Sequence, residues 1–140
     1  MNTAEFMNIF KDVELVGNKI VLKDEVSKAV EFVKLNYDFN ILKEIIAVDL
    51  GDDGIELNYH LFSVENEEDL ILSTVVTGEA ESVSNIFNSA IADENEIYDL
   101  FGINFIGHDD LKRLYMPESW KGNPLRKDYI EDDEKLRWND

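Results

Sequence analysis

The sequence predicts an α+β fold in which an antiparallel sheet of three to four strands carries helices on one face. Two observations support this prediction. Runs of alternating apolar and polar residues occupy the middle of the chain, and segments with helical spacing of apolar residues flank them. A chain of 140 residues with 44% hydrophobic residues can bury one core. We therefore expect one α+β domain over 1–103, followed by an extended docking segment over 104–140.

The N-terminal third predicts two helices with a weak strand between them. The first helix covers 3–11, the strand 19–23 and the second helix 24–36, with Asp24 as a suitable N-cap. Their apolar stripes would be formed by Phe6, Met7, Ile9, Phe10, Val26, Ala29, Val30 and Val33. Such stripes repeat every three or four residues, so both helices are expected to pack against the sheet.

The middle of the chain predicts three antiparallel strands, over 39–50, 55–64 and 70–77. The sequence Gly-Asp-Asp-Gly at 51–54 is typical of a tight turn and predicts a hairpin between the first two strands. In the second strand, apolar residues alternate with polar ones, which indicates one buried face and one wet face. An acidic loop leads to the third strand, and Gly78 ends the sheet.

Residues 83–100 predict the last helix, with its cap at Ser82 or a neighbour and its end at Gly102. Its inward side chains would be Ile86, Phe87, Ala90, Ile91 and Ile97. The order of the main elements is then β-α-β-β-β-α, which is typical of helices packed on one sheet face. Beyond Phe101 no helical or strand period continues, and the last ten residues are expected to fray.

The composition argues against several classes of function. The net charge of −18 opposes binding to nucleic acid or to an anionic membrane surface. The chain has no cysteine, so it lacks the thiolates that hold iron-sulfur clusters. No apolar run approaches twenty residues and the start does not resemble a signal peptide, so we expect neither membrane insertion nor secretion. Aspartate and glutamate are the only charged residues over 44–111 apart from histidine, whereas lysine and arginine predominate over 112–127.

A long irregular motif near the C-terminus carries a family resemblance. The run EIYDLFGI followed by FIGH, DLKRL and WKGNPLRKDY resembles the C subunit of NADH-quinone oxidoreductase, which is the "30 kDa" subunit family. Weaker similarity in IIAVDL and GIELNYHLFS extends the resemblance to about residues 18–130. Relatives of this subunit also occur in energy-converting membrane-bound nickel-iron hydrogenases. The short length and the departures at Ala92, Asp93, Asn95, Asp109, Asn123 and Ile130 favour the hydrogenase form.

The resemblance implies a non-catalytic hydrophilic subunit that clasps the large catalytic subunit of a membrane-bound complex. The complex would evolve hydrogen with electrons from ferredoxin and would couple this reaction to ion translocation. Its iron-sulfur clusters, and nickel-iron, would lie on other subunits, including a small iron-sulfur subunit, and this chain would bind no cofactor. Membrane subunits would be contacted indirectly, so the chain would be cytoplasmic and peripheral on the inner face of the membrane. The alternative is the corresponding 30 kDa subunit of an NADH-quinone or F420-linked dehydrogenase.

The predicted partner interface combines aromatic, glycine, proline and charged residues. Aromatic and arginine side chains are enriched in interface cores, and prolines lower the cost of ordering an extended segment. The residues are Glu96, Tyr98, Asp99, Phe101, Gly102, Phe105, Gly107, His108, Arg113, Trp120, Gly122, Pro124, Leu125, Arg126, Lys127, Asp128 and Tyr129. The alternative is that the aromatic side chains pack back onto the chain's own sheet.

Two further classes of function stay open. Glu94, Glu96 and Asp99 could serve a free-standing hydrolase as general acid and base, since Glu96 and Asp99 are spaced to share a helix face. The same carboxylates could instead pair with Arg113, Arg126 or Lys127 and fix the docking segment. An acidic mimic of nucleic acid would bind a basic protein.

The two histidines lack the spacing of a metal site. His60 is interpreted as a cross-strand surface residue. His108 is interpreted as a structural hydrogen bond or a partner contact, with a role in proton transfer as the alternative.

Overall fold

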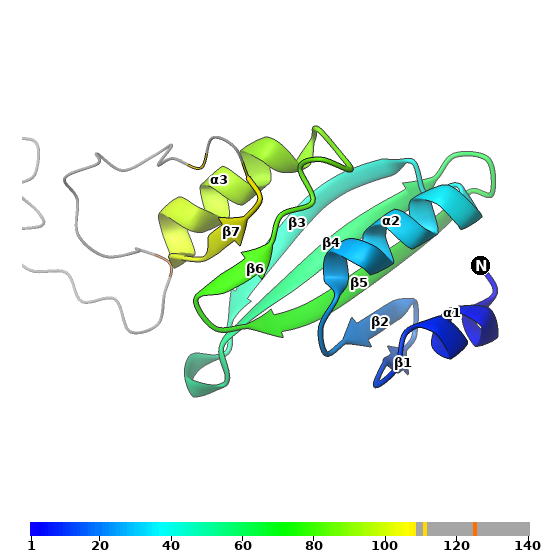
Figure 1. Cartoon of the computed structure of the whole chain (residues 1–140), viewed down its shortest axis with the longest axis horizontal. Helices are drawn as coiled ribbons and strands as arrows, with labels where there is room; N and C mark the ends of the chain where they lie inside the picture. The colour runs from blue at the N-terminus through cyan, green and yellow to red at the C-terminus, as the bar shows by residue number, and fades with distance from the viewer. Residues whose placement is uncertain (109–110, 112–124, 126–140) are drawn as a thin grey trace, which may run out of the picture.

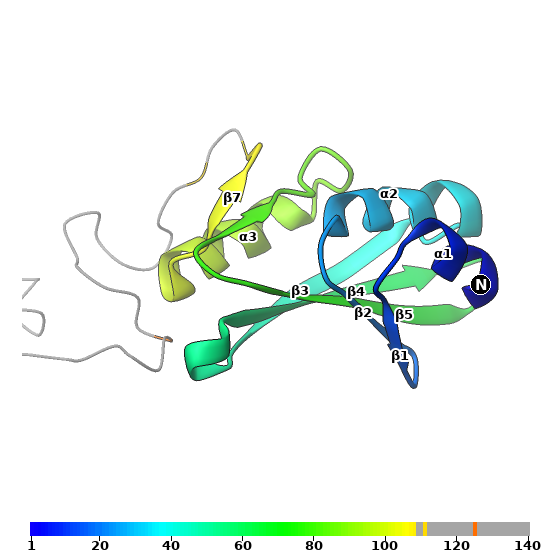
Figure 2. The same ribbon diagram turned by 60° about the horizontal axis from the view of Figure 1, so that its bottom comes forward.

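The structure is a computed structural model that describes residues 1–108, 111 and 125 (Figure 1). Its helices α1, α2 and α3 lie on the same side of a five-stranded sheet (Figure 2), so the α+β class and the one-sided helical layer are confirmed. The elements are α1 (Thr3–Ile9), β1 (Glu14–Val16), β2 (Lys19–Leu22), α2 (Val26–Tyr37), β3 (Ile41–Asp49), η1 (Gly51–Asp53), β4 (Ile55–Ser63), β5 (Glu68–Val76), β6 (Glu79–Glu81), α3 (Ala90–Phe101) and β7 (Asn104–Ile106). None of the described helices is both long and apolar enough to cross a bilayer.

The large sheet has the strand order β1-β2-β5-β4-β3. Strands β3, β4 and β5 form the antiparallel meander that the sequence predicts, with Tyr59 of β4 opposite Ile45 of β3 and Leu72 of β5. Strand β2, however, runs parallel to β5, with Ile20 opposite Leu72. The sheet is therefore mixed, and the prediction of a purely antiparallel sheet was wrong. Helix α2 carries the chain across the sheet from β2 to the far edge at β3, which leaves β2 beside β5.

A second, two-stranded sheet was not predicted. Strand β6 pairs in parallel with β7, with Ala80 opposite Phe105. Residues 104–106, which open the predicted docking segment, therefore hydrogen-bond to the main body of the chain. The boundary proposed at residue 103 stays a prediction.

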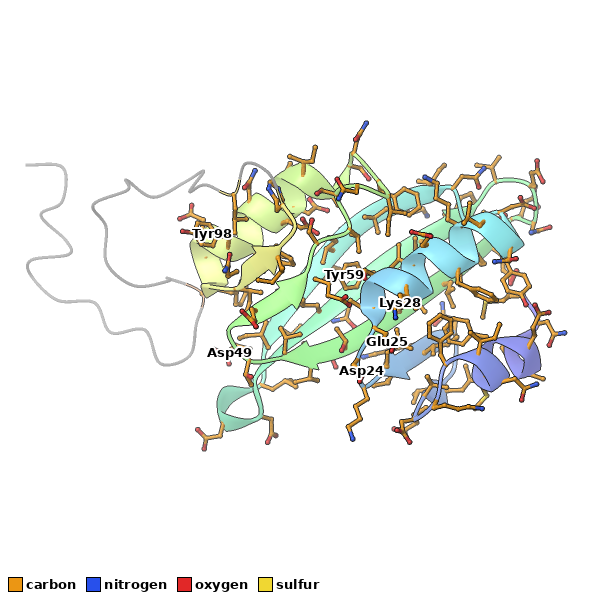
Figure 3. All side chains as sticks on the ribbon, in the orientation of Figure 1. Asp24, Glu25, Lys28, Asp49, Tyr59 and Tyr98 are labelled. Carbon is orange, nitrogen blue, oxygen red and sulfur yellow. The ribbon has the colours of Figure 1, made fainter. Side chains whose placement is uncertain are left out.

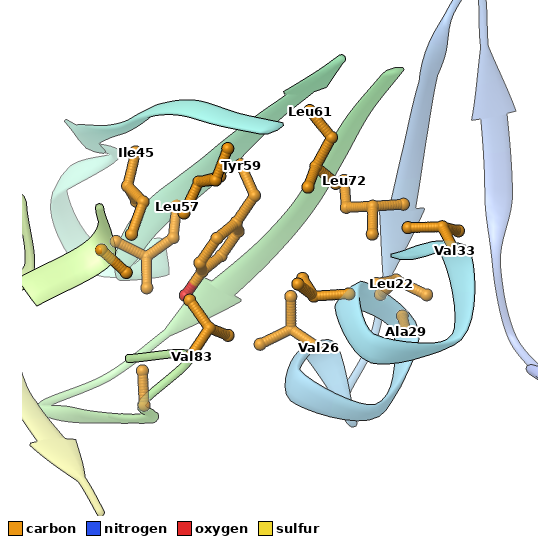
Figure 4. Packing of buried hydrophobic residues seen from close by; sticks show 14 of the residues in the cluster. Leu22, Val26, Ala29, Val33, Ile45, Leu57, Tyr59, Leu61, Leu72 and Val83 are labelled. Atoms are coloured by element: carbon orange, nitrogen blue, oxygen red, sulfur yellow. The ribbon is translucent and has the colours of Figure 1, made fainter. Parts of the chain in front are cut away.

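The core lies between α2 and the covered face of the sheet. Val26, Ala29, Val30 and Val33 of α2 are all buried, as predicted. They face apolar side chains of β2, β4 and β5 (Figure 4). Helix α1 adds Phe6, and Phe10 follows as its C-cap. Their rings stack at 4.7 Å between centroids and meet Phe32 edge-on. Met7 and Ile9 are exposed, contrary to the prediction, because a helix of seven residues packs only this short stripe against α2.

Both helix starts differ from the predicted ones. Helix α2 begins after Glu25, which has φ of 60° and no side-chain capping bond, rather than after Asp24. Helix α3 begins at Ala90 and not at 83, because residues 83–87 form a separate turn in which the Phe87 N–H donates to the carbonyl of Val83 at 2.9 Å. The chain changes direction after this turn, and Ile91, predicted to be buried, is exposed.

Candidate functional site

The described part of the predicted interface lies at one end of the molecule, on α3, on β7 and in the turn after β7. Tyr98 marks this end, far from the start of α2 marked by Glu25 and Lys28 (Figure 3). We call residues 90–108 together with Leu125 the docking end. The predicted interface residues within it are Glu96, Tyr98, Asp99, Phe101, Gly102, Phe105, Gly107, His108 and Leu125. Those outside the described residues are Arg113, Trp120, Gly122, Pro124, Arg126, Lys127, Asp128 and Tyr129.

Helix α3 buries an unusual set of side chains. Beside the apolar Ala90 and Ile97, it buries the polar Glu94, Asn95 and Asp99. Buried carboxylates are rare in proteins unless hydrogen bonds or charges compensate them. The arrangement of α3 therefore depends on the polar groups around it.

Glu94 connects α3 to the segment that follows β6. Its Oε1 accepts a hydrogen bond from the Ser82 hydroxyl at 2.6 Å, and its Oε2 accepts one from the Val83 backbone N–H at 2.8 Å. Val83 is the first residue of the turn at 83–87, so the carboxylate caps the first backbone N–H of that turn. This contact fixes α3 relative to the small sheet.

The environment raises the pKa of Glu94 above its usual range. Burial is the main cause, and the hydrogen bonds from Ser82 and Val83 and the nearby His108 oppose it. The neighbouring Asp93 also has a raised pKa, again chiefly through burial, although the Ile45 N–H donates to its Oδ2 at 3.0 Å. The adjacent carboxylates of Asp93 and Glu94 thus accept hydrogen bonds from two different segments of the chain, β3 and residues 82–83.

His108 lies over the same cluster. Its Nε2 is 3.3 Å from the Ile91 carbonyl oxygen and 4.0 Å from Oε1 of Glu94, and only 2% of its side chain is exposed. His108 therefore makes a hydrogen bond within the chain, which is one of the two roles expected for it, and its contact with a partner stays a prediction. These contacts bring the turn after β7 against the first turn of α3.

Two glycines shape the chain at this end. Gly102 ends α3 in the left-handed region, with φ of 78°, and its N–H donates to the Tyr98 carbonyl at 3.0 Å, as predicted. Gly107 has φ of 92°, a conformation that favours glycine, and it directs His108 back toward α3.

The docking end also exposes apolar side chains. Ile91, Ile106 and Leu125 are 42%, 54% and 53% exposed, whereas Tyr98 and Phe101 are half-buried. The Leu125 N–H donates to the Leu100 carbonyl at 3.0 Å, which places this residue of the C-terminal segment beside the last turn of α3. Phe105, by contrast, is buried in the chain's own core. One aromatic side chain thus follows the alternative of packing inward.

The three carboxylates considered for a hydrolase do not form a paired site. Glu94 is fully buried and bound by Ser82 and Val83, and Asp99 is fully buried, whereas Glu96 is exposed. Glu96 and Asp99 therefore differ in their access to solvent. General acid and base catalysis requires groups that reach a common substrate, and these side chains lie in different environments.

The structure confirms the prediction that His60 is a cross-strand surface residue. It lies on the uncovered face of the sheet, with Nε2 at 2.8 Å from Oδ1 of Asp69 and Nδ1 at 3.9 Å from Oε1 of Glu44. The hydrogen bonds from His60 and Lys43 hold the pKa of Asp69 below its usual range. Within residues 1–108, 111 and 125, no group of three acidic or histidine side chains has the geometry to hold a metal ion.

The sequence-based prediction missed Ser82 as a partner of Glu94. It placed Tyr59 on the buried face of its strand, which the structure confirms, but it did not foresee the surroundings of the Tyr59 hydroxyl. The Tyr59 hydroxyl is buried and has no hydrogen-bond partner in the described part of the chain. Burial, with Glu94 and Glu81 nearby, raises its pKa far above the usual range. A detectable signal did exist for Glu94, because Ala90, Glu94 and Ile97 follow the helical spacing of a buried stripe.

Comparison with known proteins gives the family. Residues 20–135 match the family model described as "Respiratory-chain NADH dehydrogenase, 30 Kd subunit". The C subunit of the NADH-quinone oxidoreductase of Moorella thermoacetica is 33% identical over 134 residues, which are 89% of this chain and 90% of that protein. Its counterpart in Geotalea uraniireducens is 38% identical over 115 residues, which are 79% and 70% of the two chains.

A longer relative matches over a shorter stretch. The C/D subunit of the NADH-quinone oxidoreductase of Phocaeicola vulgatus is 40% identical over 102 residues, which are 70% of this chain and 20% of that protein. The chain thus spans about a fifth of the C/D protein's length. The residues matched by the family model include the β4 and β5 core, the Glu94 cluster and the docking end. The chain belongs to the family of the 30 kDa subunit of respiratory-chain NADH dehydrogenase.

Proposed function

We propose that this chain is a non-catalytic subunit of a complex-I-related membrane-bound oxidoreductase and that it clasps the large catalytic subunit through its docking end. The observation that carries the proposal is where the family motif lies in the fold. The motif starts within α3, continues through β7 and His108, and includes Leu125, all at one end of the molecule. Family membership supplies the class of complex.

The chemistry of the docking end supports this role. Exposed apolar side chains at Ile106 and Leu125 belong to the same end as the half-buried aromatic ones at Tyr98 and Phe101. The hydrogen bonds of Glu94 and His108 hold this end in one arrangement before any partner arrives. A rigid surface loses less conformational entropy on binding, which favours affinity. The partners proposed are the large catalytic subunit and a small iron-sulfur subunit.

The finer proposal is that the complex is an energy-converting nickel-iron hydrogenase that receives electrons from ferredoxin. The departures from the family pattern at Ala92, Asp93 and Asn95 support it. In that complex the clusters and nickel-iron lie on neighbouring subunits, and the chain is peripheral on the cytoplasmic face of the membrane. The 30 kDa subunit of an NADH-quinone or F420-linked dehydrogenase is the competing assignment.

The experiment is a mild detergent extraction of the tagged protein from its native membranes, followed by mass spectrometry. A nickel-iron large subunit in the eluate would support the hydrogenase. A quinone-reductase homologue without nickel would support the dehydrogenase. Recovery of an unaccompanied monomer under conditions that preserve other membrane complexes would contradict the proposal.

A charge-removal test addresses the basic segment directly. Replacing Arg126 and Lys127 with Ala is expected to lower the amount of large subunit recovered. The melting temperature should change little, because surface substitutions typically alter stability by less than about 0.5 kcal/mol. The matched control removes the same charge at Lys135 and Arg137. Equal recovery from both double variants would argue against docking through Arg126 and Lys127.

A further inference from the structure

Strand β3 forms one edge of the large sheet, and its two halves differ. In the first half, side chains of the α3 region occupy the outward backbone groups. The Ile45 N–H donates to Oδ2 of Asp93 at 3.0 Å, and the Ser89 hydroxyl donates to the Leu42 carbonyl at 3.0 Å. Edge strands are commonly protected in this way against pairing with other chains. This protection covers the outward groups of Leu42 and Ile45 in the first half of β3.

In the second half of β3, Ala47 directs its backbone N–H and C=O away from β4. The Leu50 N–H donates to the Gly54 carbonyl across the hairpin, and Ile45 donates outward, so the odd-numbered residues direct their N–H and C=O away from β4. Ala47 is the next of these odd-numbered residues. Within the part of the chain that the structure describes, no group bonds to the outward N–H or C=O of Ala47. These groups match the backbone of one more extended strand.

The side chains beside this backbone are apolar and exposed. Ile46 and Val48 lie on the uncovered face of the sheet and are 47% and 42% exposed. Val75 of β5 extends the same face, separated from Val48 by Glu56 of β4. The strand ends at Asp49, which is labelled in Figure 3. A strand added at Ala47 would cover Ile46 and Val48 with its own alternate side chains.

Acidic groups surround the second half of β3. Glu44 precedes it, and Asp52 and Asp53 follow it in the exposed η1 turn. Glu56 of β4 is paired with Lys19 of β2 at 3.3 Å. The sequence from Glu44 to the end of β7 contains no lysine or arginine that could balance Glu44, Asp52 and Asp53. A segment that docks here is therefore favoured when it carries lysine or arginine at its ends.

We propose that the second half of β3, from Ile46 to Leu50, is a strand-addition site for an extended segment of another protein, with branched apolar residues at alternate positions and basic residues flanking them. This surface is separate from the docking end, and the proposal goes beyond the proposed function without depending on which complex the chain serves. A second copy of the chain fits poorly. Two-fold pairing about Ala47 would bring the acidic groups of both copies together, in a molecule of net charge −18.

The test places a photo-crosslinking amino acid at position 46 in the tagged chain, expressed in its native host and irradiated in intact membranes. A crosslink to an extended, basic segment of another protein is expected. A crosslink to residues 109–140 of the same chain, to a second copy or to a helix of a partner would overturn the proposal, as would no crosslink at all. A parallel probe at the exposed Ile106 reports on the docking end, so failure of one surface is distinguishable from failure of the other.

Two substitutions sharpen the test. Val48→Lys introduces repulsion toward a basic strand without touching the core, and it should lower the crosslink yield from position 46 about tenfold, as expected for a loss of about 1.4 kcal/mol. Val64→Lys is the matched control, since Val64 is a 57% exposed valine outside the proposed site. Equal yields from the two variants would contradict the proposal.

Ala47→Pro removes the outward N–H while leaving the inward-facing N–H groups that pair β3 with β4. It is expected to lower the same crosslink yield to a similar degree. Because the Val48→Lys variant leaves the backbone unchanged, the proposal stays testable even where the proline variant folds poorly.

Discussion

Helices α2 and α3 pack on the same side of one sheet, yet they are attached by different forces. Helix α2 buries only apolar side chains, among them Val30 and Val33. Helix α3 buries Glu94, Asn95 and Asp99 and is connected through hydrogen bonds to Val83 and Ile45. Apolar burial depends on area and tolerates small shifts, whereas hydrogen bonds require defined positions. Apolar burial by α2 thus stabilises the fold, whereas hydrogen bonds fix the position of α3. The family motif begins in α3.

The largest effect is expected where the apolar attachment is broken. Val30 is fully buried in the middle of α2, so Val30→Asp would bury an unpaired charge and should cost more than about 4 kcal/mol in the free energy of unfolding. Urea denaturation followed by circular dichroism measures the loss. Leu35→Asp on the same helix is the control, since Leu35 is 70% exposed and should lose less than about 0.5 kcal/mol. Similar losses at both positions would show that α2 does not pack as described.

The stability contributed by the Glu94 hydrogen bonds should depend on whether the substituted side chain can still form them. Glu94→Ala leaves the Val83 N–H and Ser82 hydroxyl without their acceptor and should cost about 2 to 4 kcal/mol. Glu94→Gln can accept from Val83 and donate to Ser82, so it should stay within about 1 kcal/mol of the wild type. Both are measured by urea denaturation at neutral pH. Equal destabilisation by the two variants would mean that the charge itself is required.

The pH dependence of stability provides a further test of Glu94. Because its folded pKa is raised, the folded state binds a proton more tightly than the unfolded state does. The Glu94 contribution to the free energy of unfolding is then greatest below the ordinary glutamate pKa, about 4.3, and is lost as the pH rises through the raised value. Glu94→Gln lacks this loss, so its stability relative to wild type should increase from about pH 4 toward neutral pH. A constant difference across that range would contradict the raised pKa.

The smallest effect is expected at the protected edge of β3. Asp93→Asn keeps an acceptor for the Ile45 N–H but removes its charge, and the change in stability should be less than about 1 kcal/mol. Asp93→Ala removes the acceptor and should cost about 0.5 to 1.5 kcal/mol more. Hydrogen exchange at the Ile45 amide gives a local measurement. Unchanged protection of that amide in Asp93→Ala would show that the carboxylate does not cover the edge.

The same contrast explains what the sequence alone could predict. The stripe of α2 and the alternation in β4 come from local periodicity, and both predictions are confirmed. The start of α3 was misplaced because 83–87 has helical character but turns away, a bend set by the Ser82 and Glu94 contact across the fold. The direction of β2 and the pairing of β6 with β7 depend on distant partners, which no local pattern encodes.

The parallel pairing of β2 with β5 has a consequence for how the chain reaches its native state. Lys19 lies opposite Ile71, and helix α2, strand β3 and strand β4 separate them along the sequence. During synthesis, β2 therefore emerges from the ribosome well before the strand that completes its ladder. Because non-local pairing requires the entropy of loop closure to be lost first, the β3–β4 hairpin is expected to form early and β2 to join late. In the interval, Ile20 and Leu22 are without their native neighbours on β5, so nascent chains should be most susceptible to chaperone capture before residue 71 leaves the exit tunnel.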